Sequence, residues 1–165
     1  MTFLEKDLEQ IIYESGRDLL EEKGLLIDGK LMRQVRIGNY GIADLISIIK
    51  PVYDWDKYGK KTIFIEGSIT IYELKKEKIG ISALLQAVRY ARGIQRYLKQ
   101  RDKHHLFKLS ICLIGNDIDK SGSFIYLPSL LDTQCFGLSF YTYTIDINGL
   151  KFINHDSVKL KNEGF

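Results

Sequence analysis

The chain has 165 residues, of which 45% are hydrophobic and 27% charged, and it contains only two prolines. This composition excludes disordered, collagen-like and low-complexity classes, and no run approaches the roughly 20 apolar residues of a membrane span. The formal charge of +3 is too small to identify a nucleic-acid-binding protein by itself, so the position of the charges matters more than their sum.

The first ten residues carry acids within a helical pattern, which is not typical of a secretory signal or a transit peptide. Two cysteines are too few for a disulfide framework, and Cys112 lies in an apolar run, so we expect a reduced, cytoplasmic protein. The three histidines have no cysteine pair nearby, so a structural zinc site is not expected. Because no linker rich in Gly, Ser or Pro divides the chain, residues 1–165 are expected to form one domain.

Apolar residues recur at helical spacing over residues 4–22, with acids between them, which predicts one or two amphipathic helices ending near Gly24. Met32–Ile37 shows the alternation of a strand and is followed by Gly38-Asn39, a turn signal. The chain is therefore expected to open with helical structure and to continue into a sheet.

The next segment predicts two further strands separated by an excursion. Ile42–Ile49 is rich in β-branched residues, and residues 51–61 are typical of an exposed loop or a hairpin. Thr62–Leu74 is again β-rich, with Gly67 expected to form a bulge or a turn.

The second half begins with an amphipathic helix over residues 83–99, and the Ser82 hydroxyl is expected to cap it. A buried strand over 108–114 follows, whereas 124–131 is ambiguous. Residues 140–153 predict a hairpin that turns at Asn148-Gly149. The order of helix, three strands, helix and strand, with extra elements after it, indicates an α/β protein.

Three polar residues occupy places where a strand favours apolar ones. Asp44 interrupts the second strand, and Glu73 and Lys75 end the third, two residues apart and so on the same face. A buried, charged and unpaired acid costs several kcal/mol, so something must compensate it. Two carboxylates holding Mg²⁺, helped by the carbonyl of Leu74, would do so and would suit phosphodiester hydrolysis. Lys75 would then orient the attacking water or stabilise developing negative charge.

A Glu-x-Lys triplet alone has little value, since Glu21 and Lys23 form the same triplet at a polar helix end. The triplet at Glu73 differs because it closes a β run, follows a strand that carries Asp44 and precedes an amphipathic helix. An ordinary cross-strand salt bridge on a half-exposed sheet remains the alternative.

The helix over 83–99 carries two stripes at about 100° per residue. The first is apolar and is expected to face the core: Leu84, Val88, Ala91, Ile94 and Leu98. The second lies roughly opposite: Gln86, Tyr90, Gly93 and Tyr97. Glycine in a helix interior costs about 1 kcal/mol relative to alanine, which suits close approach by another backbone or a ligand. Arg89, Arg92 and Arg96 lie between the stripes, where they would either bind phosphates or form a solvated face.

Asp44, the Glu73-Leu74-Lys75 triplet and Gln86 followed by Tyr90 together resemble the PD-(D/E)xK nuclease superfamily, in particular its RecB-like members. The opening EKDLEQII, and then RQVRIGNYGIADLI, ELKK and LLQAVRYA, are similar to archaeal Holliday-junction resolvases. They are also similar to the nuclease domain of archaeal and actinobacterial endonucleases that act on mismatched or branched DNA. The resemblance covers roughly residues 3–115.

This resemblance implies a restriction-endonuclease-like αβββαβ core over about 3–115, with a mixed central sheet flanked by helices and a C-terminal β extension over 116–165. It implies that Asp44 and Glu73 hold Mg²⁺, with Mn²⁺ as a substitute, and that Glu5 assists, with Glu9 as the fallback. Lys75 matches the catalytic lysine, Gln86 the residue that positions the site or substrate, and Tyr90 the partner of Gln86. Arg89, Tyr90, Arg92 and Arg96 are the expected contacts to nucleic acid.

The sequence departs from the family pattern in two places. Ala43, rather than a proline, precedes the aspartate. Asp44 and Glu73 are 29 residues apart, which is longer than the tight hairpin usual in the family, so residues 51–61 must loop out if the two acids are to meet.

The expected function is therefore that of an Mg²⁺-dependent deoxyribonuclease. The alternatives are a catalytically inactive module of the same fold that binds nucleic acid or a protein partner and, more weakly, an enzyme that acts on RNA. No membrane partner is expected, and a homodimer through the hairpin at 140–153 is left open. The tail aromatics Phe140, Tyr141 and Tyr143 are expected to pack in the sheet rather than to stack on bases.

Overall fold

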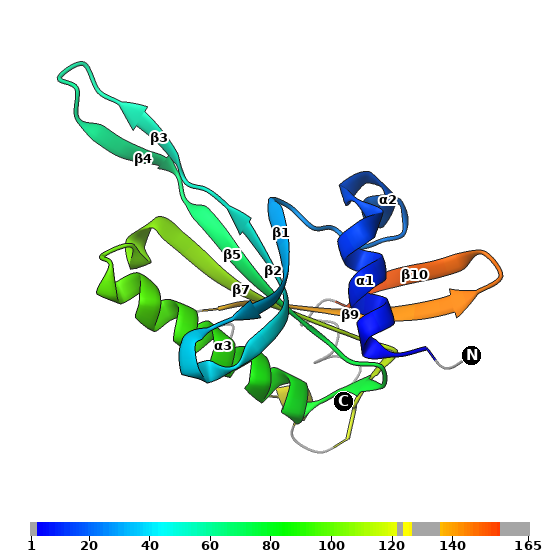
Figure 1. The fold of residues 1–165 in the computed structure, drawn as a ribbon. Coiled ribbons are helices and arrows are strands. Elements are labelled where there is room, and N and C mark those ends of the chain that lie inside the picture. Colours follow the sequence, from blue (N-terminus) through cyan, green and yellow to red (C-terminus); the bar gives the residue numbers. More distant parts are fainter. Residues whose placement is uncertain (1–2, 122–123, 127–135, 156–165) are drawn as a thin grey trace.

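The structure is a computed structural model that describes residues 3–121, 124–126 and 136–155. Its centre is a mixed six-stranded sheet in the order β1-β2-β5-β7-β9-β10 (Figure 1). The strands are β1 (Lys30–Arg36), β2 (Ile42–Ile49), β5 (Gly67–Leu74), β7 (Phe107–Gly115), β9 (Gly137–Asp146) and β10 (Gly149–His155). Neighbouring strands are antiparallel at both edges, whereas β5, β7 and β9 run parallel to one another.

Helices cover both faces of this sheet. On one face α3 (Ile81–Gln100) packs on alternate strand residues such as Ile71 and Ile111. On the other face α1 (Glu5–Ser15) and α2 (Arg17–Glu22) pack on the residues between them, such as Tyr72 and Cys112. The expected α/β architecture with a mixed, helix-flanked sheet is confirmed, and so is the division of the N-terminal pattern into two helices.

The third predicted strand, Thr62–Leu74, is in fact two strands in different sheets. It breaks at Gly67, where a Cβ atom would lie 2.6 Å from the carbonyl oxygen of Ile49 and 2.8 Å from the Phe107 ring. Only a residue without a side chain allows this close approach. The part before the break is β4 (Lys61–Ile65), which pairs with β3 (Val52–Trp55) as a separate two-stranded sheet.

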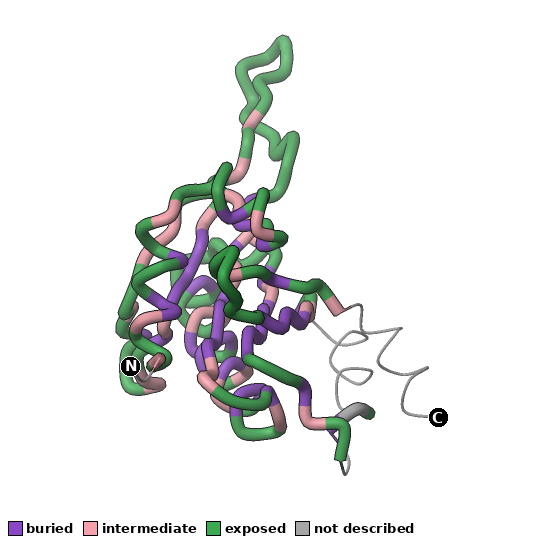
Figure 2. Tube along the Cα trace, turned by 90° about the vertical axis from the view of Figure 1, so that its right-hand side faces the viewer, coloured by how far each residue is buried: buried purple, intermediate pink, exposed green. Residues whose placement is uncertain are grey.

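The β3–β4 hairpin extends away from the body, as the labels β3 and β4 show in Figure 1. Its tube is almost wholly exposed along its length, in contrast to the buried strands below it (Figure 2). The excursion predicted at residues 51–61 is therefore a hairpin, which runs on to Ile65, and it loops out as the spacing of the two acids required.

The start of the long helix differs from the expectation. α3 begins at Ile81, its N-cap is Gly80, and the described structure has no side-chain capping hydrogen bond there. Ser82 is exposed within the first turn, so the prediction that its hydroxyl caps the helix is wrong. The backbone of Gly80 provides the entry instead, because its carbonyl accepts from the N–H of Leu84.

The C-terminal segment completes the central sheet rather than forming an appendage. β9 pairs parallel to β7, and β10 returns antiparallel to β9. The turn of this hairpin is Ile147-Asn148, one residue earlier than predicted, because Gly149 already pairs with Asp146. The ambiguous segment 124–131 contains a short 3-10 helix, η3 (Phe124–Tyr126), and its remainder lies outside the described residues.

The remaining described elements are short: η1 (Gly38–Tyr40), η2 (His104–Leu106), β6 (Lys78–Ile79) and β8 (Asp117–Ile118). β6 and β8 pair with each other just beyond the ends of β5 and β7. Among the helices that the structure describes, none combines the length and the apolar character needed to cross a membrane.

Candidate metal and active site

The register of β2 and β5 brings the two predicted acids to the same end of the sheet. Leu45 is the partner of Tyr72 in this antiparallel pair, so Asp44 lies beside Glu73. Asp44 also contacts the next residue of β5, because the backbone N–H of Leu74 donates to Oδ2 of Asp44 at 3.0 Å. The long separation in sequence is closed by the hairpin that leaves the sheet between the two strands.

Glu73 is a buried carboxyl group, with a residue exposure of 2%. Its Oε1 is 3.1 Å from the ammonium of Lys75, but its Oε2 is fully buried and has no hydrogen-bond partner among the described residues. Burial, and then the nearby charge of Asp44, raise the pKa of Glu73 to about 7. A buried oxygen without a hydrogen-bond partner is costly, and a bound cation would be a suitable partner for it.

Lys75 follows the last residue of β5 and lies on the same side as Glu73, as the spacing predicted, and it is half-buried. Burial lowers the pKa of Lys75, but the carboxylates of Glu73, Glu5 and Asp44 raise it by more, so the net direction is upward. The ammonium therefore stays protonated at neutral pH. A charged lysine stabilises negative charge and does not accept a proton.

Asp44, the second acid of the site, is half-buried. Burial is the largest cause of its raised pKa; the N–H of Leu74 and the charge of Lys75 lower it, while Glu9 and Glu5 raise it. The electrostatics thus place two α1 glutamates close to the acids of the sheet. Three carboxylates, those of Glu73, Glu5 and Asp44, act on the one ammonium of Lys75, and a divalent cation would relieve this excess of negative charge.

The two α1 glutamates differ in what they already bind. Oε2 of Glu5 accepts from the backbone N–H of Lys76 at 3.0 Å, and Glu5 is otherwise exposed. Glu9 is buried, and its oxygens accept from Arg33 Nε at 2.9 Å and from the Gln34 amide. Glu5 therefore has the freer carboxylate, and the structure favours it over Glu9 as the assisting residue. Glu5 and Lys75 together line an open depression of about 660 Å³.

Sequence reasoning missed the residue that holds the backbone next to Lys75. The hydroxyl of Tyr143, on β9, donates to the carbonyl oxygen of Lys76 at 2.7 Å. The N–H of Lys75 donates to the carbonyl of Ile114 at 2.8 Å. No local signal marks a tyrosine so far along the chain. The expectation that Phe140, Tyr141 and Tyr143 pack in the sheet is confirmed, since all three are buried.

The second stripe of α3 packs against the segment between β1 and β2. Gln86 Nε2 donates to the hydroxyl of Tyr90 at 2.8 Å, and the Tyr90 ring lies against Gly41. A Cβ atom on Gly93 would lie 2.7 Å from both Ile37 and Tyr40, which explains the glycine. Tyr90 is only 4% exposed, which leaves its ring little surface for a contact with nucleic acid, and that role stays a prediction.

The arginines of α3 are exposed, as expected for either a phosphate-binding row or a solvated face. Arg92 donates to Gln95 at 2.9 Å and lies over the Phe136 ring, and Arg96 donates to the Tyr40 hydroxyl at 3.5 Å. A role for Arg89, Arg92 and Arg96 in binding nucleic acid stays a prediction.

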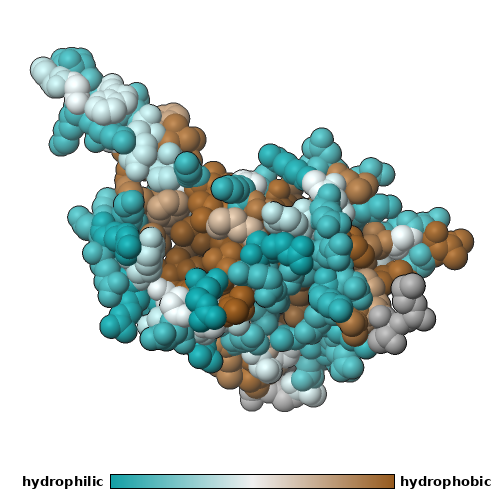
Figure 3. Space-filling view, viewed as in Figure 1, coloured by the Kyte–Doolittle hydropathy of each residue, from teal (hydrophilic) through white to brown (hydrophobic). Residues whose placement is uncertain are grey.

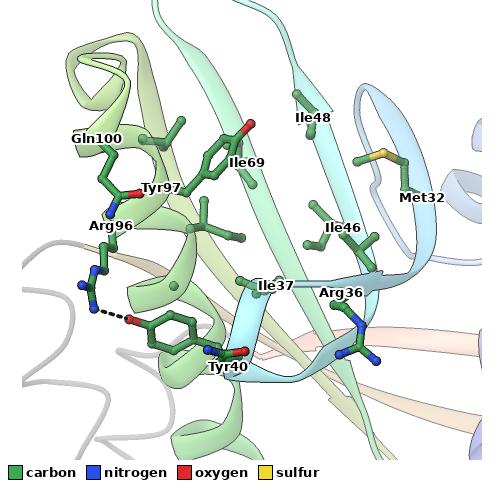
Figure 4. Close-up of a pocket in the computed structure, with 16 residues that line it drawn as sticks. Met32, Arg36, Ile37, Tyr40, Ile46, Ile48, Ile69, Arg96, Tyr97 and Gln100 are labelled. Carbon is green, nitrogen blue, oxygen red and sulfur yellow. Dashed lines mark hydrogen bonds between the residues drawn. The ribbon is translucent and has the colours of Figure 1, made fainter.

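A larger cleft lies away from these acids. It has a volume of about 720 Å³ and lies between α3 and the β1–β2 side of the sheet, with Ile46, Ile48 and Ile69 on its floor and the Tyr40–Arg96 hydrogen bond at one end (Figure 4). Figure 3 shows apolar surface in this region, below the base of the hairpin. None of the described residues that line it carries a carboxylate, so it offers no metal site.

A second group of metal-ligand types occurs after α3. Asp102, His104 and His105 each offer one ligand atom, and these atoms lie within 4.8 Å of one another. All three are exposed, and Arg101 and Lys103 are their neighbours in sequence. The local positive charge opposes a cation there, so we draw no site from this group.

The comparisons with known proteins give one distant structural likeness. No family model and no curated protein matches this chain. Among solved structures, the chain is similar to a repair endonuclease from Pyrococcus abyssi, at 18% sequence identity and a TM-score of 0.44. The match covers 84% of this chain and 46% of the other, so this chain spans less than half the length of that protein.

Proposed function

We propose that this chain is a divalent-metal-dependent nuclease that hydrolyses phosphodiester bonds of DNA. The observation that carries the proposal is the meeting of Asp44, Glu73 and Lys75 at one end of the sheet, with a buried carboxylate oxygen of Glu73 unpaired among the described residues. An ordinary salt bridge between Glu73 and Lys75 would not explain why that oxygen is buried without a partner, or why several acids lie close to it.

The donor set suits Mg²⁺ or Mn²⁺, because it consists of hard carboxylate oxygens. Asp44 and Glu73 would hold the ion, with the Leu74 carbonyl and Glu5 as further ligands. A bound ion would supply polarisation of the scissile phosphate and a lowered pKa of a bound water. The ammonium of Lys75, kept charged by its carboxylate neighbours, would stabilise the negative charge that develops on the phosphate.

Other residues of the chain would keep this arrangement in place. Tyr143 and Ile114 fix the backbone on either side of Lys75. Gln86 is half-buried and is held by Tyr90, so it is placed to orient rather than to react. The exposed arginines of α3 would contact substrate phosphates.

The test is incubation of the chain with supercoiled, single-stranded and branched DNA, and with RNA, in Mg²⁺ or Mn²⁺. We expect metal-dependent cleavage that is lost in Asp44→Asn and reduced at least a hundredfold in Lys75→Ala, an effect of the size expected for one transition-state donor. Lys23→Ala is the matched control, since Lys23 ends the same Glu-x-Lys triplet far from the site, and it should cleave normally.

Calorimetry with Mn²⁺ separates the nuclease from a binding module of the same fold. The nuclease should take up Mn²⁺, and Asp44→Asn should abolish the uptake. Cleavage that survives Lys75→Ala, or the absence of cleavage in all substrates, would contradict the proposal. Cleavage confined to RNA would overturn the assignment to DNA.

A further inference from the structure

The β3–β4 hairpin carries exposed aromatic rings on a two-stranded ribbon that projects from the body (Figure 1). Trp55 is 63% exposed, Tyr58 81% and Phe64 69%. A lone two-stranded hairpin is marginally stable in water, and large apolar side chains held in solvent indicate a surface that meets a partner. Within the described part of the chain, β3 and β4 pair only with each other.

One face of this ribbon combines rings with a cation. Tyr53 pairs with Ile63 and Trp55 pairs with Lys61, so these four side chains share a face. The Lys61 ammonium lies 3.8 Å from the centroid of the Tyr53 ring and 5.8 Å from that of Trp55. At the tip, Lys57 lies 5.0 Å from the Tyr58 ring. Tyr53, Trp55 and Tyr58 are thus each accompanied by positive charge.

The acids of the hairpin are engaged by its own backbone. Oδ1 of Asp56 accepts from the N–H groups of Tyr58 and Lys60 at 2.9 and 2.8 Å, which builds the turn. Oδ1 of Asp54 accepts from the N–H of Trp55 at 2.8 Å. Over residues 51–65 the three lysines exceed the two aspartates by one, and both aspartates are held against the backbone. The side chains that reach the rings are therefore lysines rather than acids.

We propose that the β3–β4 hairpin is an arm that binds single-stranded nucleic acid by stacking unpaired bases on its rings while its lysines contact phosphates. Aromatic rings beside cations are the usual means of binding single strands without a sequence preference. A second copy of the chain fits less well, because lysines along an exposed ribbon disfavour pairing of its edge with another strand. For the substrate of the enzyme, the inference rests on the proposed function: the arm would select DNA that has an unpaired strand.

The position of the arm sets how it would act. It leaves the sheet at the end opposite the acids, since Ile49 lies five residues after Asp44 along β2. At 3.3 Å per residue this is roughly 17 Å before the hairpin begins. A strand on the arm would therefore be held several nucleotides from the cleaved bond, and the arm would affect the KM of long substrates and leave that of very short ones unchanged.

Trp55 is the only tryptophan of the chain, so its fluorescence reports on the arm alone. The full chain is titrated with single-stranded oligo(dT), oligo(U) and a duplex of equal length, in a chelator so that no cleavage occurs. We expect saturable quenching by the single strands and at least tenfold weaker binding of the duplex. Tyr53→Ala should weaken binding roughly five- to hundredfold, the loss expected for one stacked base.

Two matched variants control for folding and for charge. Tyr58→Ala lies at the exposed tip and touches no core residue, so it should fold normally and still weaken binding. Lys61→Gln should weaken binding, whereas Lys151→Gln, an equal charge change on exposed β10, should not. Quenching equal to that by duplex, or binding unaffected by Tyr53→Ala and Tyr58→Ala, would overturn the proposal, and so would a Trp55 signal that depends on protein concentration alone.

The titration and the cleavage assay can fail separately. Quenching by single strands without cleavage in Mg²⁺ would support binding by the arm and contradict the proposed nuclease activity. Cleavage without quenching would support the nuclease activity and contradict binding by the arm. Quenching by only one of oligo(dT) and oligo(U) would show that more than ring stacking is involved and would overturn the stated mode of binding.

Discussion

The Glu73 side chain is buried, has one unpaired oxygen and has a raised pKa. All three properties arise from its position in the sheet. The strand that places it in the sheet also removes it from water, and β2 brings Asp44 beside it. Lys75 compensates one oxygen only. In the absence of a cation, this carboxyl group should therefore destabilise the fold whenever it is ionised.

The substitution Glu73→Gln should stabilise the metal-free protein in a pH-dependent way. Because the folded pKa is raised to about 7, from 4.5, the folded state binds a proton that the unfolded state releases, and stability falls as pH rises through 7. Thermal unfolding in a chelator should show Glu73→Gln more stable at pH 8, by about 1–3 kcal/mol. The gain should shrink towards pH 5, and Mn²⁺ should stabilise the wild type only. An equal gain at both pH values, or a similar profile for the exposed control Glu21→Gln, would contradict this origin.

Tyr143 tests how far the site depends on a residue outside the sequence pattern. Tyr143→Phe keeps the ring, which packs 5.9 Å from the Phe3 ring, but removes the hydrogen bond to Lys76. We expect a loss of about 1 kcal/mol in the free energy of unfolding, measured by urea denaturation. Cleavage should fall while Mn²⁺ uptake is kept, because the variant disturbs Lys75 and not the acids. Loss of both together would show that Tyr143 supports the metal ligands instead.

At the scale of elements, α3 is fixed by its glycine as much as by its apolar stripe. Leu84, Ala91 and Leu98 are buried as predicted, but so are Tyr90 and Gly93 from the second stripe. The helix therefore packs along two directions, on the sheet and on the segment Ile37–Gly41.

Gly93→Ala should destabilise the protein although alanine favours helix. The helical gain is about 1 kcal/mol, whereas overpacking costs typically 1–3 kcal/mol, and the atoms met at 2.7 Å belong to Ile37 and to the Tyr40 ring close to its backbone. We expect a net loss of about 1 kcal/mol in chemical denaturation. Ser82→Ala, exposed in the same helix and not a cap, should change stability little. A more stable Gly93→Ala variant would show that Tyr40 moves aside freely.

Much of the core of the fold could be predicted from local patterns. Alternation and helical periodicity located the central strands and α3, and the two-residue spacing of Glu73 and Lys75 placed them on one face. The sequence could predict that Asp44 and Glu73 meet only on the condition that residues 51–61 loop out. The reason is that the register of the two strands depends on how the intervening residues leave the sheet. The break at Gly67, the entry of α3 at Gly80 and the hydrogen bond of Tyr143 arise from contacts between distant segments, and no local pattern encodes them.

At the scale of the whole molecule, the sheet and the β3–β4 hairpin are separable. Replacing residues 51–66 with a short Asn-Gly turn should leave the six-stranded sheet intact, because Ile49 and Ser68 are already register partners. We expect a melting temperature within a few degrees of the full chain, measured by circular dichroism. Mn²⁺ uptake should also be unchanged, while binding of oligo(dT) should be lost. Unfolding of the shortened chain would show instead that the hairpin supports the sheet.

The chain leaves the sheet at Ile49 and re-enters it at Ser68 as immediate neighbours across one strand spacing, about 4.8 Å. Any ribbon or small module whose ends lie that close could be grafted there without moving the end of the sheet that carries Asp44 and Glu73. Under the proposed function, substrate recognition and hydrolysis could then be exchanged independently, by transplanting a single loop.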